Sequence, residues 1–221
     1  MIESLRGGLV VSCQAYPGEP LRDPYITGQT ALAVVAGGAV AVRAQGLSDI
    51  RVVVDAVDVP VIGIWKDGTS GVVITPTLDH ALAVIEAGAH IVALDGTRRP
   101  RPDGRTLGET VASLRAAADV LVMADCGSLD DARAAEDAGV DIIGTTLAGY
   151  TGERAATVGP DLELVRLIAA ACRLPVMAEG RIRSPEDVDA AFGAGAFSVC
   201  VGTAITHPTS ITRTFVERAR R

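Results

Sequence analysis

Lys66 is the residue of this sequence whose chemistry is hardest to replace. It is the one lysine among 20 basic residues, and all the others are arginine. An arginine guanidinium stays protonated in proteins, whereas a partly desolvated lysine ammonium can release its proton near neutral pH. Lowering its pKa by about three units would require about 4 kcal/mol of differential environment. Lys66 is therefore a candidate for proton transfer; the alternative is a lysine that reaches solvent or pairs with Asp67.

Three further polar residues stand, like Lys66, at the ends of short apolar runs. Gln14, Asp125 and Glu179 each follow a run of Val, Leu, Ile, Met or Ala. Polar groups at the ends of buried strands need one another or a ligand, because an apolar interior does not stabilise them. Glu179 is the candidate for a second proton-transfer group opposite Lys66. Gln14 and Asp125 are candidates for orienting Lys66 or for contacting a substrate.

Arg43 and Asp95 end apolar runs of a second, alternating series. Arg43 could hold a substrate oxygen or neutralise Glu179, and Glu179 could instead be a structural partner of Arg43 or Arg181. Asp95 is expected to anchor the loop that follows it.

This loop, segment 97–106, is rich in arginine, and two interpretations of it are open. Nucleic-acid binding fits the negative net charge poorly, so a stiff loop over the site or at a subunit contact is expected.

Two glycine-containing segments could bind a phosphate. Gly180 and Arg181 follow one apolar run, and Gly202 and Thr203 follow the next. Glycine lets backbone N–H groups approach a phosphate closely, and Arg181 adds positive charge. These four residues are therefore candidate contacts of a phosphorylated ligand.

A repeated pattern organises the elements that must position these residues. A helix end, a glycine and an apolar strand recur at 34–43, 84–95, 135–146 and 191–203. A second set of apolar runs lies at 8–14, 60–66, 119–125 and 174–180. Such short, almost continuously hydrophobic runs are typical of parallel strands covered on both faces.

Eight strands alternating with eight helices over 221 residues predict an α/β fold, a single-domain (β/α)8 TIM barrel of the phosphate-binding type spanning 1–221. In such a barrel, chemistry lies at the carboxyl ends of the strands. An open doubly wound sheet is the alternative, and the lack of a GxGxxG turn after the first strand disfavours it.

Local signals mark the helix ends within this pattern. Ser128 and Ser184 each precede an aspartate by three residues, which predicts helix starts with an aspartate variant of the capping box. Gly88, Gly139 and Gly195 are expected to end helices in the left-handed conformation.

Composition and charge disfavour several classes of function. An aromatic content of 3% and a net charge of −7 disfavour nucleic-acid binding. No apolar run is long enough to span a bilayer, and we expect no signal peptide. Four cysteines without CxxC spacing, and histidines that avoid the strand ends, disfavour a metal site. The cysteines predict buried thiols in a reducing cytoplasm.

Six segments, spread over nearly the whole chain, carry a family resemblance. They read VSCQAYPGEPL (11–21), GGAVAVRAQG (37–46), PVIGIWK (60–66), ITPTLDHALAVIEAGAHIVALDGTRRPRPDG (74–104), MADCGSLDDARAAEDAGVDIIGTTLAGYT (123–151) and PVMAEGRIRSPEDVDAAFGAGAFSVCVGTAIT (175–206). The chain resembles the N-acetylmannosamine-6-phosphate 2-epimerases, and SCQAYPGEPL, RPRPDG and GTTLAGYT are the most specific of these matches.

The resemblance implies a cytoplasmic isomerase of sialic acid catabolism. Such an enzyme interconverts N-acetylmannosamine 6-phosphate and N-acetylglucosamine 6-phosphate without a metal or nucleotide cofactor. The resemblance implies that Lys66 and Glu179 are the catalytic pair. It implies sugar-contacting or orienting roles for Gln14, Arg43 and Asp125, and phosphate contacts for Gly180, Arg181, Gly202 and Thr203. The expected partners are a sugar phosphate and a second copy of the chain in a homodimer, with no nucleic acid and no membrane.

Two departures from the family pattern affect the sugar contacts or lid closure rather than the catalytic pair. After the lysine the family usually reads Arg-Asp-Tyr within a longer loop, whereas segment 67–71 reads Asp-Gly-Thr-Ser-Gly. Before Pro208 the family commonly has arginine, whereas this chain has His207.

Two other functions are left open by the sequence. A noncatalytic sensor with this barrel would bind a sugar phosphate without converting it. A phosphosugar decarboxylase of the same superfamily would need a DxKxxD pattern, and GIWKDG (63–68) lacks its first aspartate. In the epimerase hypothesis, Lys66 handles the C2 proton of the ring-opened sugar, and Glu179 assists ring opening or proton transfer on the opposite face.

Overall fold

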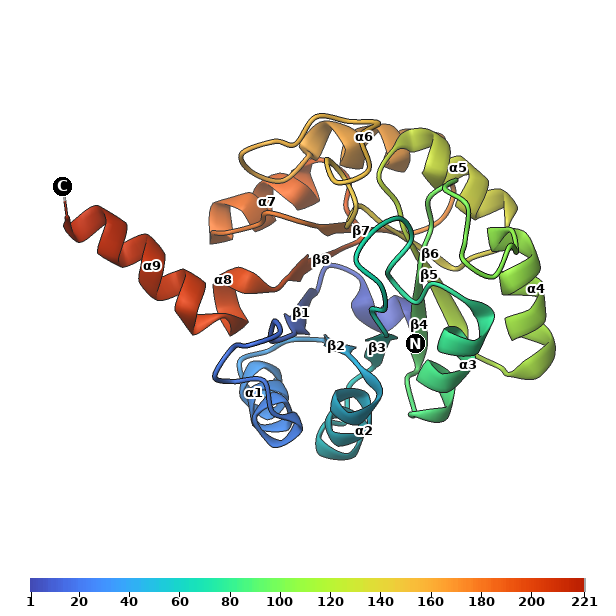
Figure 1. Cartoon of the computed structure of the whole chain (residues 1–221). Helices are drawn as coiled ribbons and strands as arrows, with labels where there is room; N and C mark the ends of the chain where they lie inside the picture. The colour runs from blue at the N-terminus through green and yellow to red at the C-terminus, as the bar shows by residue number, and fades with distance from the viewer. Residues whose placement is uncertain (221) are drawn as a thin grey trace.

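Parallel strands close into a barrel, each hydrogen-bonded to the next, and β8 returns to pair with β1 (Figure 1). The computed structural model describes residues 1–220. The strands are β1 (Leu9–Cys13), β2 (Ala41–Gln45), β3 (Val61–Ile64), β4 (Ile91–Asp95), β5 (Leu121–Asp125), β6 (Ile142–Gly144), β7 (Val176–Glu179) and β8 (Ser198–Val201). The predicted (β/α)8 barrel is confirmed, and the open sheet is excluded.

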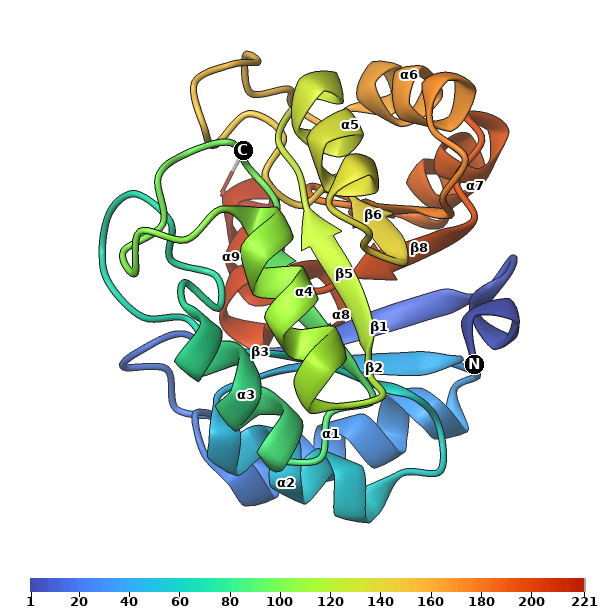
Figure 2. The ribbon, with the colours of Figure 1, turned by 90° about the vertical axis from the view of Figure 1, so that its right-hand side faces the viewer.

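Helices follow the strands and pack on the outside of the barrel, as Figure 2 shows for α3, α4 and α5. A short 3-10 helix precedes β1 at Ile2–Leu5. The helices are α1 (Pro24–Ala36), α2 (Leu47–Ala56), α3 (Leu78–Glu86), α4 (Leu107–Ala117), α5 (Leu129–Asp137), α6 (Leu162–Ala171), α7 (Pro185–Gly193), α8 (Thr203–Thr206) and α9 (Pro208–Ala219).

The core has two apolar clusters because alternate residues of a strand face opposite sides of the sheet. One cluster fills the barrel and includes Val10, Ile62, Met123 and Met177, with Leu5 of the N-terminal 3-10 helix. The other lies between the strands and the surrounding helices. Inward positions near the carboxyl ends of the strands are therefore the places where the chain can present polar groups to the barrel mouth.

Helix starts follow the predicted caps, with one correction. Ser128 and Ser184 accept hydrogen bonds from the backbone N–H groups of Asp131 and Asp187, over 3.1 and 3.3 Å. The two aspartates do not return bonds to their caps, so the predicted capping boxes are wrong. Asp131 instead accepts from the N–H groups of Arg98 and Gly127. Its carboxylate is used to fix a loop rather than a helix end.

The glycines before the even-numbered strands have the expected left-handed backbone. Gly88, Gly139 and Gly195 have φ values of 97°, 85° and 101°. A side chain is strained in this conformation, whereas glycine adopts it freely. This part of the repeated pattern is confirmed.

The last helix departs from the barrel. The single turn α8 is followed by α9, which extends away from the barrel (Figure 1). No residue of α9 is buried, and Phe215 is 74% exposed. A groove of about 620 Å³ is left beside β1 and α1. Its apolar lining residues include Leu9, Val11, Ile26, Ala33, Val34 and Ile205. The eighth helix therefore does not cover the barrel of its own chain.

Candidate active site

A buried arginine joins two carboxylates at the carboxyl end of the barrel. Arg43 of β2 donates through Nη1 and Nη2 to the two carboxylate oxygens of Asp125, over 3.0 and 2.5 Å. Its Nη1 also donates to Oε2 of Glu179 over 2.8 Å. Arg43 is 1% exposed, so these contacts replace the water that the charged groups lose. Two carboxylates against one guanidinium leave an excess of negative charge beside the barrel mouth.

Strand geometry explains this meeting. Ala41 and Arg43, Met123 and Asp125, and Met177 and Glu179 are successive inward positions of β2, β5 and β7. Asp125 and Glu179 end their strands as predicted. The sequence placed Arg43 at a strand end as well, but β2 continues for two residues beyond it to Gln45. Arg43 therefore lies deeper in the barrel, where its side chain reaches both carboxylates.

Two threonines after β6 hold the carboxylates in place. Thr146 Oγ1 donates to Oδ1 of Asp125 over 2.6 Å. Thr145 Oγ1 accepts from the Glu179 N–H and donates to the Glu179 carbonyl oxygen, each over 3.0 Å. The backbone of Glu179 is thus fixed on both sides, which limits the directions its carboxylate can take.

Lys66 lies opposite this cluster and pairs with Gln14. Its Nζ donates to Oε1 of Gln14 over 2.8 Å, and Gln14 Nε2 donates to Ser12 Oγ over 2.6 Å. Strand β3 ends at Ile64, so the prediction that Lys66 ends the strand is wrong by two residues. Lys66 forms instead an isolated antiparallel bridge with Ile74, across the short loop. The loop folds back on itself and fixes the backbone of Lys66.

Burial lowers the pKa of Lys66 from its ordinary value. The positive charge of Arg43 lowers it further, and the negative charges of Glu179 and Asp125 oppose the shift. The charges of these four groups therefore act on one another at the carboxyl end of the barrel. The predicted alternative partner of Lys66, Asp67, lies instead 3.3 Å from Nε2 of His80. A lysine in this environment supplies a neutral amine more readily than a lysine in water.

Glu179 is shifted in the opposite sense. Burial raises the pKa of Glu179, and the charge of Asp125 adds to the rise, while Arg43 and Lys66 oppose it. Burial also raises the pKa of Cys200, the neighbour of Glu179 in β8, so that this thiol stays protonated. The site thus pairs a lysine whose ammonium is a stronger acid than usual with a glutamate whose carboxylate is a stronger base than usual, a combination that suits proton transfer in both directions.

The two predicted phosphate segments lie side by side, because β7 and β8 are neighbours in the barrel. Gly180 follows β7 with a φ of 109°, and Gly202 follows β8 and precedes α8, of which Thr203 is the first residue. A Cβ at Gly202 would lie 3.3 Å from Cβ of Ser12. Glycine therefore permits close packing at this corner of the site.

Arg181 belongs to the same corner, but its side chain is engaged elsewhere. Its Nη1 donates to the carbonyl oxygen of Ala148 over 2.9 Å, and its Nε donates to that of Gly159 over 3.1 Å. The backbone of Arg181 has a φ of 58°, which is uncommon outside glycine. The guanidinium therefore ties down the loop between β6 and α6 in this structure. The sequence left open whether Glu179 pairs with Arg43 or with Arg181. In the structure Glu179 contacts Arg43 and does not contact Arg181.

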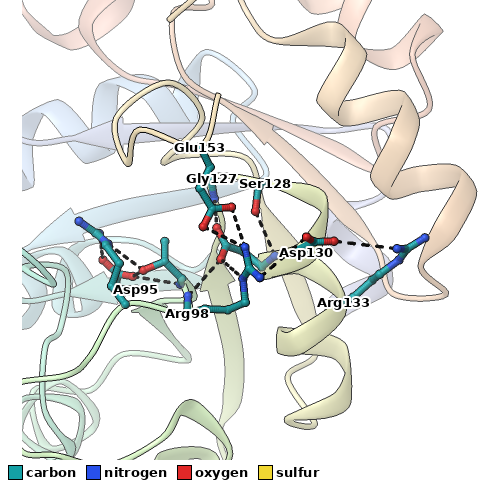
Figure 3. A network of polar contacts seen from close by, with 10 residues as sticks. Asp95, Arg98, Gly127, Ser128, Asp130, Arg133 and Glu153 are labelled. Atoms are coloured by element: carbon teal, nitrogen blue, oxygen red, sulfur yellow. Dashed lines mark hydrogen bonds and ion pairs between the residues drawn. The ribbon is translucent and has the colours of Figure 1, made fainter. Parts of the chain in front are cut away.

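The arginine-rich loop after β4 is held by acidic groups of this chain (Figure 3). Asp95 accepts from the N–H and Oγ1 of Thr97, over 3.0 and 2.6 Å, and from Arg99 over 2.7 Å. Arg98 Nη2 donates to both carboxylate oxygens of Glu153, each over 2.9 Å. The predicted anchoring role of Asp95 is confirmed. Arginines paired in this way are poorly suited to bind nucleic-acid phosphates.

Sequence reasoning missed Ser12, Thr146 and Cys200, which contact or adjoin the predicted site residues. All three occupy inward positions. Ser12 lies two residues before Gln14, Thr146 lies two residues after Gly144, and Cys200 lies two residues before Gly202. Extending the two-residue period of each strand to both sides of the polar residue would have identified them.

Within residues 1–220, no group of three or more His, Cys, Asp or Glu side chains could hold a metal ion. Over the same residues, helices lack the length and hydrophobicity needed to cross a bilayer.

The barrel and its polar mouth define a class, the (β/α)8-barrel enzymes that act through side chains at the carboxyl ends of the strands. The model of the NanE family, described as "Putative N-acetylmannosamine-6-phosphate epimerase", matches residues 27–221. The chain belongs to this family. A relative from Cutibacterium acnes with 2-epimerase in its name is 59% identical, over 100% of this chain and 97% of its own length.

One solved structure agrees with this assignment, and a second shares the fold. The N-acetylmannosamine-6-phosphate 2-epimerase from Clostridium perfringens is similar, with a TM-score of 0.94 and 37% identity over 98% of this chain and 95% of that one. Thiamine phosphate pyrophosphorylase from Pyrococcus furiosus has a TM-score of 0.63 at 18% identity, over 98% of each chain, which shows the shared fold alone.

Proposed function

We propose that this protein interconverts N-acetylmannosamine 6-phosphate and N-acetylglucosamine 6-phosphate by inverting C2. The observation that carries the proposal is the arrangement at the carboxyl end of the barrel, where Arg43 joins Asp125 and Glu179 and where Lys66 is hydrogen-bonded to Gln14. Inverting C2 requires loss of a weakly acidic C–H proton. Ring opening makes this possible, because the aldehyde at C1 then accepts the electron pair as an enolate.

We assign proton transfer at C2 to Lys66. The neutral amine takes the C2 proton, the C2–H electron pair moves into the enolate, and a proton delivered to the opposite face gives the epimer. Glu179 assists ring opening or serves the opposite face. Gln14, Arg43 and Asp125 orient these groups or hold the sugar oxygens and stabilise the developing charge.

The phosphate is assigned to the corner formed by Gly180, Gly202 and Thr203. Backbone N–H groups at this corner can approach a phosphate without obstruction from a side chain at either glycine. Arg181 is placed at the same corner, and we propose that it contributes positive charge there while it holds the β6–α6 loop.

Either epimer, incubated with the protein in deuterated water, is expected to acquire deuterium at C2 and to equilibrate with the other epimer. The carbon-bound proton passes through a group that exchanges with solvent, so NMR follows its loss. Binding of the sugar phosphate without exchange would contradict the proposal and would identify a sensor. Release of carbon dioxide from a phosphosugar acid would identify a decarboxylase.

We also propose that two copies of the chain form a homodimer by exchanging α9. This helix presents Ile211 and Phe215 four residues apart on one face, and none of its residues is fully buried in its own chain. An isolated helix of this length is marginal in water, so a packing partner is required to stabilise it. The apolar groove beside α1 occupies the place of the missing eighth helix. Because a (β/α)8 barrel has a helix at this position, the occupant that we propose for the groove is the α9 helix of a second copy.

Phe215→Asp is expected to convert the dimer to a monomer, because it places a carboxylate on the face of α9 that enters the groove. Light scattering should then give the 22.7 kDa of one chain instead of twice that mass. Leu167→Asp, which changes a partly exposed position of α6, is the matched control and should leave the dimer intact. A monomeric natural protein, or a Phe215→Asp variant of unchanged mass, would refute the exchange.

The location of the protein is proposed from its thiols. All four cysteines are free, and three of them are buried. This supports a reducing compartment, and we infer the cytoplasm.

A further inference from the structure

The junction between α8 and α9 contacts the end of β1 and the loop that follows it. Thr206 Oγ1 donates to the carbonyl oxygen of Ser12 over 2.7 Å. Thr209 Oγ1 donates to Oε2 of Glu19 over 2.8 Å, and Nε2 of His207 lies 3.4 Å from Oε1 of the same carboxylate. The junction therefore holds this segment at two points, one at the end of β1 and one in the loop before α1.

His207 is fixed in the orientation that this contact needs. The residue is 6% exposed, and its Nδ1 lies 2.6 Å from Oγ of Ser210. The ring of Tyr16 meets the imidazole edge-on, with the ring centroids 4.9 Å apart. Nε2 is left directed at Glu19, and it has no hydrogen-bond partner among the described residues. The imidazole thus connects α9 to the loop.

Gln14 lies between the two held points. Its Nε2 donates to Oγ of Ser12, and its Oε1 accepts the hydrogen bond from Nζ of Lys66. Gln14 directly follows β1 and begins the loop that carries Glu19. Any movement of this segment changes the one hydrogen-bond acceptor that the structure gives to Lys66 within residues 1–220.

We propose that the α8–α9 junction positions Gln14 against Lys66, and that His207 and Glu19 are positioning residues for proton transfer. The inference rests on the proposed role of Lys66 at C2. Release of the contact frees the β1–α1 loop, Gln14 moves with it, and the amine loses the orientation that directs it at the substrate. A cavity of about 360 Å³ adjoins the contact and gives the loop room to move. It is lined by Ala15, Glu19, Pro20, Leu21, Thr206, His207, Pro208 and Thr209.

A double-mutant cycle on turnover tests the coupling. His207→Ala and Gln14→Ala are each expected to lower kcat by about threefold to tenfold, the range of a lost hydrogen bond, with a smaller change in KM. If His207 acts through Gln14, the double variant is no slower than Gln14→Ala alone. Losses that multiply in the double variant, or a Gln14→Ala variant with natural turnover, would overturn the proposal.

Conservative and control variants separate positioning from folding. His207→Arg should recover at least about half of the natural kcat, because a guanidinium can reach Glu19 across the adjoining cavity. His207→Leu, of similar size but unable to contact Glu19 through a polar atom, should stay slow; equal turnover of the two variants would contradict the proposal. Glu3→Gln, which breaks an exposed pair with Arg6 outside the site, is the control and should leave kcat unchanged. Light scattering checks that all variants have the same molar mass, so that differences in kcat do not reflect a change of oligomeric state.

The proposed function and this inference fail in different ways. A Lys66→Arg variant that keeps its turnover refutes the role of Lys66 itself. An inactive Lys66→Arg variant together with multiplicative losses in the cycle leaves that role intact and refutes the coupling through Gln14.

Discussion

Lys66→Arg should lower turnover by at least about 100-fold, the lower range for loss of general acid–base catalysis. Arginine keeps the positive charge and much of the length of lysine, but it does not release a proton near neutral pH. The variant therefore removes proton transfer while it preserves the charge balance with Glu179 and Asp125. Turnover is measured as deuterium exchange and epimer formation by NMR. Retention of more than about a tenth of natural turnover would contradict the role of Lys66.

The pH profile provides a second measure of the same role. Because burial lowers the pKa of Lys66, the natural rate should rise with pH as the amine loses its proton, in a limb below the ordinary lysine value of 10.5. The variant should lack this limb. Its melting temperature should remain close to the natural one, because Lys66 makes a single hydrogen bond at the edge of the site.

Arg43→Met should destabilise the fold by about 3–5 kcal/mol, the cost of leaving a buried charge without its partner. Methionine fills much of the same volume, but Asp125 and Glu179 then face each other inside the barrel without a cation between them. The free energy of unfolding from urea titrations checks this. Arg133→Met, which breaks an exposed pair with Asp130, is the matched control and should cost less than about 1 kcal/mol.

The loss in Arg43→Met should depend on pH. Without the guanidinium, which opposes the rise in the pKa of Glu179, that pKa is raised further in the folded state, so protonation stabilises the variant. Stability is then present at low pH and is lost as pH rises through the folded pKa of Glu179. The gap between variant and natural protein should therefore be smaller at pH 5.5 than at pH 7.5. A gap that widens on acidification would show that the cluster does not balance charge in this way.

The sequence indicated most of the candidate site because polar residues interrupt apolar runs at recognisable places. Gln14, Lys66, Asp125 and Glu179 lie within two residues of a strand end in the structure. Strand ends that share one face of a barrel must meet, so the fold class alone brought these positions together. Arg43 was harder to place, because its strand continues past it and sequence does not show which side chains it reaches.

Side-chain direction decided the remaining roles. Arg181 stands beside a glycine after β7, as a phosphate contact would, yet its guanidinium binds carbonyl oxygens of the β6–α6 loop. Similarly, α9 has the sequence of an ordinary final helix, yet it does not cover its own barrel. Neither outcome can be predicted from hydrophobic periodicity or composition, because both depend on partners far along the chain or in a second copy.

The sequence by itself determined the order of the strands, the residues that cap two of the helices, the residue types at the barrel mouth and the family. These depend on local periodicity, on caps and on matching residues, and they can be recognised within short segments. Only the tertiary structure decided that Arg43 binds Asp125 and Glu179, which are 82 and 136 residues away. It alone connected His207 to Glu19 and left a groove where the eighth helix belongs. The physical reason is that packing sets contacts between distant residues, and each contact depends on the closure of the whole barrel.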